Sequence, residues 1–510
     1  MGCNMKVSVS ELCYYLFFSI LFLAKALGLY DGQPIFKICL VLAALFVFAK
    51  IILTDYDIRE FVVITALALL GVIIYRNSGE KSALIFLVMM IGFKHISLER
   101  IMKTGLIVWG LGFGTMILKS MTGIGDEIVM AHHKFGMDIL RRGLGYTHPN
   151  VLHVSYAILV ILVLFVVEDR KSRIRAYLWL MAGNVVIFLY SVSYTGFMLV
   201  TFFIFFNIYF TYRKKYSMLE KILVQSIFPV CVLFSLFAPL LVEPDTPLFN
   251  FLNKALNRRF YASRLYLQEN PLTLFGHRIY ASHSYALDSS YITLLIYGGL
   301  VLFLLVCAGY VYTIYAGMKK KDVKALSMLL SFSIAGVIEP FLFNLSFKNL
   351  SLLVIAGYLY ALNKDSQKVK LLSGWDKGIC LRMPFVQKQM RKMSRQAERW
   401  IVLTALVTGL FAGGCFYLTV HMPTTIVVGE KYCDIDGEPH SLSRAQYEEK
   451  EDVVFYGCKD ETVNVYEFDG ETIAFEKKRN MVGITFLAFS GTYFVLSCIY
   501  KSRKRKVIDI

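Results

Sequence analysis

The chain of 510 residues is 56% apolar and only 18% charged, whereas soluble globular proteins carry about 25% charged residues. Its apolar residues fall into long runs, each close to the roughly 20 residues that a helix needs to cross a membrane. This pattern excludes an ordinary soluble protein and predicts an all-α polytopic membrane protein. Cytoplasmic loops of such proteins collect Lys and Arg, so the net charge of +17 does not call for a nucleic-acid partner.

About fourteen apolar runs are predicted to span the membrane as helices, because unpaired backbone groups are too costly in lipid for any other structure. The first run is too long for the apolar region of a cleavable signal peptide. The weakest has Lys94 and His95 near its end. The runs lie near 12–29, 35–54, 60–75, 82–98, 101–118, 150–167, 174–191, 194–212, 222–242, 290–316, 324–342, 347–362, 400–420 and 481–500.

Basic clusters set the predicted orientation of these spans. With the N-terminus inside, every cluster falls on the cytoplasmic side, as the positive-inside rule requires. The clusters lie at 170–175, 213–215, 319–321, 364–399 and 501–506.

The same count predicts three parts of the chain. Residues 1–362 form a core of about twelve spans with two long outer loops, 119–149 and 243–289. Residues 363–399 form a basic cytoplasmic linker, and residues 400–510 form a module of two spans.

An extracytoplasmic segment, 421–480, is predicted between the last two spans. It alternates apolar and polar residues, and Asp469-Gly470 is typical of a hairpin turn. We therefore expect a small β-rich domain that contacts glycan, docks a partner or is purely structural. Its two cysteines, Cys433 and Cys458, either form a disulfide, as an oxidising exterior would allow, or remain buried thiols.

The outer loops contain arginines, although outer loops are normally poor in them. The planar guanidinium group grips phosphate through paired hydrogen bonds, so a lipid-linked pyrophosphate at the outer leaflet is a suitable ligand. The alternative is that each arginine reaches to lipid headgroups at the end of a span. The candidates are Arg141, Arg259, Arg264 and Arg278.

Three titratable residues near these arginines are candidate catalytic groups. His148 precedes Pro149 at the start of a span, and Asp288 lies at the end of the second outer loop. Glu339 lies late in an apolar run, where ionisable groups usually face a polar cavity, although it is also explained as an ordinary carboxylate at a span end. No pair of acidic residues typical of a metal site and no phosphate-binding glycine loop stands out, so neither a metal nor a cofactor is expected.

Four local patterns in residues 10–362 resemble the bacterial Wzy-type polysaccharide polymerase and O-antigen ligase family, especially the capsule or exopolysaccharide polymerases of Gram-positive bacteria. Each pattern alone is weak, but all four occur in the family's order and on the predicted outer side. Tyr146 stands where the family more often has Phe. The patterns are Arg141-x-x-Leu144-Gly145-Tyr146-x-His148-Pro149-Asn150, Arg259 with Leu274-Phe275-Gly276, Leu287-Asp288-Ser289-Ser290-Tyr291 with Tyr297-Gly298-Gly299, and Glu339-Pro340 with Asn344 and Asn349.

The resemblance implies an enzyme of the bacterial plasma membrane with its active site on the extracytoplasmic side. It would polymerise oligosaccharide repeat units linked to polyprenyl pyrophosphate. The arginines would stabilise the charge of the pyrophosphate leaving group. Asp288, Glu339 and His148 compete for the role of the base that accepts the proton of the acceptor hydroxyl.

Two other functions stay open at this point. One is transfer of a finished glycan to another acceptor, as in an O-antigen ligase. The other is a flippase or transporter for lipid-linked oligosaccharide, which would favour charged residues inside spans and pseudo-symmetric halves. Expected partners are the lipid-linked oligosaccharide and membrane lipid, with a flippase and a chain-length regulator as candidate protein partners.

Overall fold

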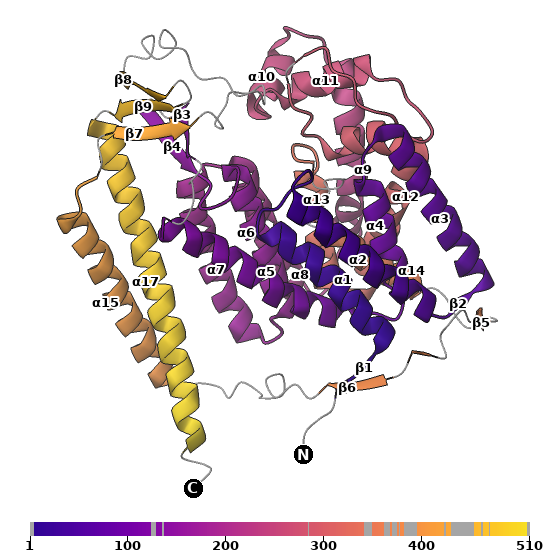
Figure 1. Cartoon of the computed structure of the whole chain (residues 1–510), viewed down its shortest axis with the longest axis horizontal. Coiled ribbons are helices and arrows are strands. Elements are labelled where there is room, and N and C mark those ends of the chain that lie inside the picture. Colours follow the sequence, from indigo (N-terminus) through magenta and orange to yellow (C-terminus); the bar gives the residue numbers. More distant parts are fainter. Residues whose placement is uncertain are drawn as a thin grey trace.

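The structure is a computed structural model that describes residues 5–123, 129–134, 137–283, 285–340, 349–361, 368–369, 375–376, 378–381, 395–422, 425–429, 453–460, 463–468 and 470–506. Most of these residues form a bundle of helices, and two further long helices stand side by side at its edge (Figure 1).

Each predicted apolar run overlaps a helix in the described part of the chain. Eleven helices in the described part of the chain are long and apolar enough to cross a membrane, so the protein is a multi-pass membrane protein. The helices are α1 (Val9–Ala26), α2 (Pro34–Leu53), α3 (Ile58–Ser78), α4 (Ser82–Ile91), α5 (Leu98–Met121), α6 (Pro149–Val166), α7 (Arg170–Ser191), α8 (Tyr194–Tyr212), α9 (Met218–Leu241), α10 (Pro247–Ala255), α11 (Arg259–Glu269), α12 (Ser290–Lys320), α13 (Val323–Ala335), α14 (Ser351–Tyr360), α15 (Arg395–Thr419) and α17 (Gly470–Lys506).

Three of the predicted spans are shorter than a membrane crossing requires. Helices α4, α13 and α14 have 10, 13 and 10 residues, against the roughly 20 that cover the hydrocarbon core. The count of fourteen spans therefore stays a prediction. Helices α10 and α11 are additional short helices within the predicted loop 243–289.

Helix α6 lies at the centre of the bundle. Of its 18 residues 72% are buried, against 22% of the most apolar windows of α2, α3 and α9. Those peripheral helices leave large apolar side chains such as Val41, Leu45 and Phe48 exposed. A continuous apolar surface of this kind is expected where lipid, and not water, surrounds the protein.

Short strand pairs mark the two ends of the bundle (Figure 1). At one end, here called the linker end, β1 (Met5–Ser8) pairs with β6 (Gly378–Leu381), and β2 (Tyr56–Asp57) pairs with β5 (Lys368–Val369). At the other, the site end, β3 (Val129–Lys134) and β4 (Met137–Arg142) form an antiparallel pair within the predicted loop 119–149.

Helix α4 connects these two ends despite its ten residues. Just before it, Lys81 Nζ lies 3.0 Å from Oδ2 of Asp31, in the connection between α1 and α2 at the site end. Just after it, Lys94 forms an ion pair with Glu60, in the first turn of α3 at the linker end. The chain therefore passes from one end of the bundle to the other through α4.

The C-terminal module consists of α15 and α17 packed against each other, with a three-stranded antiparallel sheet at the site end. Its strands are β7 (Thr425–Gly429), β8 (Val453–Asp460) and β9 (Val463–Phe468), in the order β7-β9-β8. Helix α17 begins at Gly470, so the predicted hairpin turn at Asp469-Gly470 is wrong: the chain reverses between β8 and β9. Cys433 lies outside the described residues, so its disulfide with Cys458 stays a prediction.

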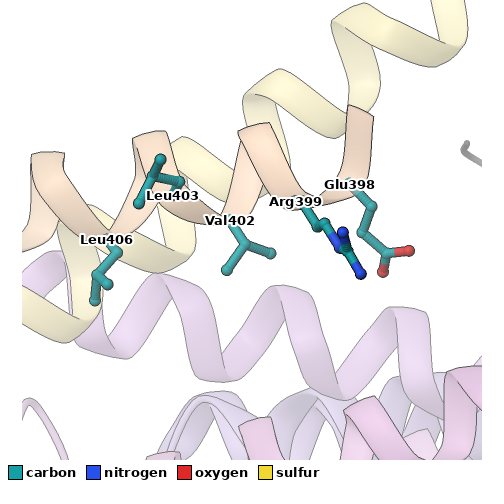
Figure 2. Close-up of a pocket in the computed structure, with 5 residues that line it drawn as sticks. All are labelled: Glu398, Arg399, Val402, Leu403 and Leu406. Atoms are coloured by element: carbon teal, nitrogen blue, oxygen red, sulfur yellow. The ribbon is translucent and has the colours of Figure 1, made fainter. Parts of the chain in front are cut away.

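A cavity of about 390 Å³ lies along α15 near the linker end. Figure 2 shows Val402 and Leu406 pointing from α15 toward a neighbouring helix of the bundle. At the end of this cavity, Glu398 forms an ion pair with Arg175 of α7. The module is thus joined to the bundle here by a charged pair, with an apolar gap beside it.

The second predicted outer loop is locked into a break in α12. At Gly299 the backbone is not helical (φ 73°, ψ 171°), and the amides of the next two residues donate to the carbonyl oxygens of Thr273 (2.9 Å) and Leu274 (3.2 Å). Gly276, with φ +73°, lies so close that a Cβ atom there would be 1.9 Å from the carbonyl oxygen of Tyr297. Two glycines that the resemblance had singled out thus meet in one backbone contact.

This contact predicts the effect of two substitutions. Gly276→Ala and Gly299→Ala should each lower the free energy of unfolding by about 1–3 kcal/mol, because a methyl group must push the facing backbone away. Thermal unfolding of the detergent-purified protein, followed by size-exclusion chromatography, measures the change. Gly114→Ala is the matched control, because its methyl group would meet nothing within 4 Å; equal effects of all three would contradict the interlock.

The separation of the two ends predicts the topology of the protein in cells. Tyr280 at the site end is 63% exposed, and Trp375 at the linker end is 76% exposed. In a variant without natural cysteines, a membrane-impermeant maleimide should label Tyr280→Cys in intact cells and Trp375→Cys only in permeabilised cells, because the basic clusters favour a cytoplasmic linker end. Labelling of Trp375→Cys from outside would reverse the predicted orientation.

Candidate functional site

Arg259 joins two carboxylates that are far apart in the sequence. Its Nε donates to Oδ2 of Asp288 (2.7 Å), and its Nη2 donates to Oε1 of Glu339 (3.3 Å). The hydroxyl of Thr195, at the start of α8, donates to the same Glu339 oxygen (2.6 Å). The Arg259 and Glu339 side chains are only 15% and 10% exposed, so the cluster is largely shielded from solvent.

The backbone on either side of this cluster fixes its geometry. Asn257 and Arg258 both have positive φ values, 52° and 65°, and this tight turn places Arg259 at the first position of α11. At the other side, the amide of Ser290 donates to the carbonyl oxygen of Gly336 (2.8 Å), and the Ser290 hydroxyl bonds to the carbonyl oxygen of Glu339. The start of α12 is thereby tied to the segment that follows α13.

Arg141 approaches the cluster from the first predicted outer loop. It is 8% exposed, its Nε donates to the carbonyl oxygen of Ser191 (2.8 Å), and its Nη2 donates to Oδ1 of Asn150 (2.7 Å). Burial, and secondarily the positive charge of Arg259, lower the pKa of Arg141 to about 10. Within the described part of the chain Arg141 forms no ion pair with a carboxylate, so the two neighbouring guanidinium groups repel each other.

His148 and Asn150 explain the spacing of the first motif. His148 is the N-cap of α6, and its Nδ1 accepts a hydrogen bond from the amide of Asn150 (3.0 Å). Pro149 occupies the first helical position, where no amide hydrogen is needed. The helix start therefore holds the Asn150 carboxamide against Arg141. His148 acts in this structure as a helix cap, and Asn150, to which it is bonded, is the residue that contacts Arg141.

The other two predicted arginines make their contacts elsewhere. Nη1 of Arg264 donates to the carbonyl oxygens of Pro239 (3.1 Å) and Val242 (3.0 Å), at the C-terminus of α9, where carbonyls lack partners within the helix. Arg278 lies beside Gly79: a Cβ atom on this glycine would be 3.4 Å from the arginine Nε. Neither arginine has a described ion pair with Asp288 or Glu339.

Several polar residues around the cluster were missed from the sequence. Thr195 and Ser191 contact Glu339 and Arg141 directly. His153 in the first turns of α6 is fully buried. Its Nδ1 lies 2.9 Å from the Ser191 hydroxyl, and its Nε2 lies 2.8 Å from Oδ1 of Asn184. Polar residues within spans are usually functional or supportive of function, so His153 and the Ser-rich break between the runs 174–191 and 194–212 were available signals.

The arrangement brings two arginines and two carboxylates to the site end of a membrane protein. Among the described residues, no group of three His, Cys, Asp or Glu side chains is placed to hold a metal ion. Chemically, buried guanidinium groups can bind a phosphate-containing anion, and the carboxylates can accept a proton.

Comparison of the chain with protein-family models, with curated proteins and with solved structures finds no match.

Proposed function

We propose that the protein is a membrane glycosyltransferase that polymerises oligosaccharide repeat units linked to polyprenyl pyrophosphate. The observation that carries the proposal is that Arg141 and Arg259, from two separate loops, lie near each other at the site end, where Arg259 also contacts two carboxylates. Arginine residues that repel each other in the absence of a ligand become favourable when an anion with two phosphate groups binds between them.

The reaction needs an anion site and a base close together. The oxygen of the acceptor hydroxyl attacks the anomeric carbon of the donor sugar, and the bond from this carbon to the pyrophosphate oxygen breaks. The electron pair leaves with the pyrophosphate, whose growing charge Arg141 and Arg259 stabilise. The proton of the acceptor hydroxyl passes to a carboxylate.

Arg259 links substrate binding to the availability of that carboxylate. In this structure its guanidinium group is engaged by Asp288 (2.7 Å) and Glu339 (3.3 Å). A pyrophosphate with more negative charge would compete for the same hydrogen-bond donors. The carboxylate that it displaces loses its cationic partner and can accept the proton of the acceptor hydroxyl.

Asp288 fits the role of base better than Glu339. Its side chain is 28% exposed against 10% for Glu339, so an acceptor hydroxyl can reach it. One oxygen of Glu339 already accepts hydrogen bonds from both Thr195 and Arg259, and such bonds reduce basicity. We assign Glu339 to orienting Arg259, and His148 to capping α6.

The proposed reaction takes place at the outer face of the bacterial plasma membrane. The orientation given by the basic clusters puts the site end outside, where a lipid-linked donor can present its sugar while its polyprenyl chain stays in the bilayer. The candidate partners named from the resemblance, a flippase and a chain-length regulator, fit a site with this location.

The first prediction from this mechanism concerns the shape of the arginines. Arg141→Lys and Arg259→Lys keep the charge but lose the planar fork. Each should reduce polymerisation by about a hundred- to a thousandfold, which would abolish long-chain glycan on gels of cell extracts, while immunoblots show unchanged protein in the membrane.

The matched control is Arg264→Lys on the same helix as Arg259. Arg264 bonds only to helix-terminal carbonyls among its described partners, which lysine can also reach, so glycan length should be normal. Purified protein in detergent with lipid-linked donor separates the alternatives: polymer formation without a membrane supports a transferase, and no product from an intact protein supports a flippase. Normal glycan length in both test variants would refute the anion site.

A second prediction separates the two carboxylates. Asp288→Asn should lower the turnover number by about 10²–10⁴ with little change in KM for the donor, because the arginines still bind pyrophosphate. Glu339→Gln should lower the turnover number much less, because Glu339 orients Arg259 and does not accept the proton. Steady-state kinetics of the detergent-purified variants tests this; an unchanged turnover number in Asp288→Asn would exclude Asp288 as the base.

A further inference from the structure

The strand that carries Arg141 is held by the C-terminal module. Nη1 of Arg479, in α17, donates to the carbonyl oxygen of Leu140 (2.6 Å). Arg479 also pairs with Glu476 one turn earlier, and Oε2 of Glu476 lies 3.4 Å from Nη2 of Arg142. Both chain neighbours of Arg141 are therefore attached to α17.

Strand geometry makes this attachment relevant to Arg141. Successive side chains of a strand point to opposite faces, so Arg142 faces α17 while Arg141 points away from it, toward Ser191 and Asn150. Fixing the Leu140 carbonyl and the Arg142 side chain on one face fixes the rotation of the strand. The direction of Arg141 follows from that rotation.

Helix α17 also holds the second support of Arg141. Tyr190, directly before the Ser191 carbonyl that Arg141 bonds, donates its hydroxyl to Oδ1 of Asn480 (3.1 Å). The Arg479 guanidinium lies over the Tyr190 ring, 4.9 Å from its centroid. Gly483 packs against the same ring, since a Cβ atom there would be 2.3 Å from the tyrosine hydroxyl.

The burial of this network indicates that it fixes a position. Arg479 is 2% and Glu476 4% exposed. A buried ion pair seldom stabilises a fold more than apolar residues would, but in some proteins it selects one arrangement among several. Farther along α17, Phe489 stacks on Trp179 of α7 with 4.5 Å between the ring centroids. This contact also packs the helix against the bundle.

We infer that Arg479 and Glu476 are positioning residues that aim Arg141 at the anion site. The inference rests on the proposed function of Arg141 as a pyrophosphate ligand. It gives the C-terminal module a role in the reaction, although none of its described residues touches the Arg259 cluster through a hydrogen bond or ion pair. Strand β9 ends at Phe468 and α17 begins at Gly470, so the sheet β7-β9-β8 directly precedes in the chain the helix that carries these two residues.

The test combines kinetics with hydrogen exchange on the full-length protein in detergent. Arg479→Lys should reduce turnover by about a hundredfold, the usual effect of a misplaced catalytic group, and combining it with Arg141→Lys should cause little loss beyond that of Arg141→Lys alone. Amide exchange should become faster in residues 137–142 and unchanged in residues 259–269.

A second variant covers the case in which Arg479→Lys does not fold. Gly483→Ala pushes α17 away from Tyr190 without removing a charge, and should give the same pattern. Gly491→Ala on the same helix is its control, because nothing lies within 4 Å of the added methyl group, and it should match the unmodified protein in both measurements.

The outcomes distinguish the two proposals. Unchanged exchange in residues 137–142 in both Arg479→Lys and Gly483→Ala overturns the positioning role, whatever the kinetics show. Losses that multiply in the double variant also overturn it, because they mean that Arg479 acts independently of Arg141. Faster exchange together with a fully active Arg141→Lys supports the positioning of the strand and refutes the proposed function of Arg141.

Discussion

The pairing of Arg259 with two carboxylates is the interaction on which the site end depends. A buried charge is strongly unfavourable unless partners of opposite charge and hydrogen bonds compensate it. Asp288 precedes α12, Glu339 follows α13, and Arg259 begins α11, so their contact brings three separate segments together. The Thr195 hydrogen bond to Glu339 adds the start of α8. Removing the arginine would take this cationic partner from both carboxylates and weaken the contact between these segments.

The same physical argument accounts for the surroundings of the site. Side chains bond backbone groups at several points around the site: Arg264 bonds carbonyls at the end of α9, His148 an amide at the start of α6, and Arg479 a carbonyl of β4. In a bundle that is largely surrounded by lipid, water is a poor substitute for such partners. Several charged residues of the site end thus stabilise the positions of helices and strands, and fewer of them are available for the proposed reaction.

The parts of the fold that follow from hydrophobic pattern were predictable. Each of the eleven long apolar helices in the described residues falls on an apolar run that the sequence shows. The lengths of α4, α13 and α14 were not predictable, because an apolar run does not show where the helix within it stops. The sequence also identified Arg141, Arg259, Asp288 and Glu339 as candidates, yet Thr195 and Ser191 escaped because a short polar break between two spans resembles an ordinary turn. Contacts such as Arg142 with Glu476, which are 334 residues apart, are not encoded in any local pattern.

The strand pair at the linker end imposes an order on synthesis. The side chain of Asp376 accepts hydrogen bonds from the amide and the hydroxyl of Ser10, at the start of α1, across 366 residues of chain, and β1 pairs with β6 beside it. At ribosomal speeds of roughly 5–20 residues per second, the first strand would wait about 20–70 s for its partner. During that interval the N-terminal segment would be unpaired and accessible to chaperones and proteases at the membrane surface. It would become protected only when residues 376–381 are synthesised and pair with it.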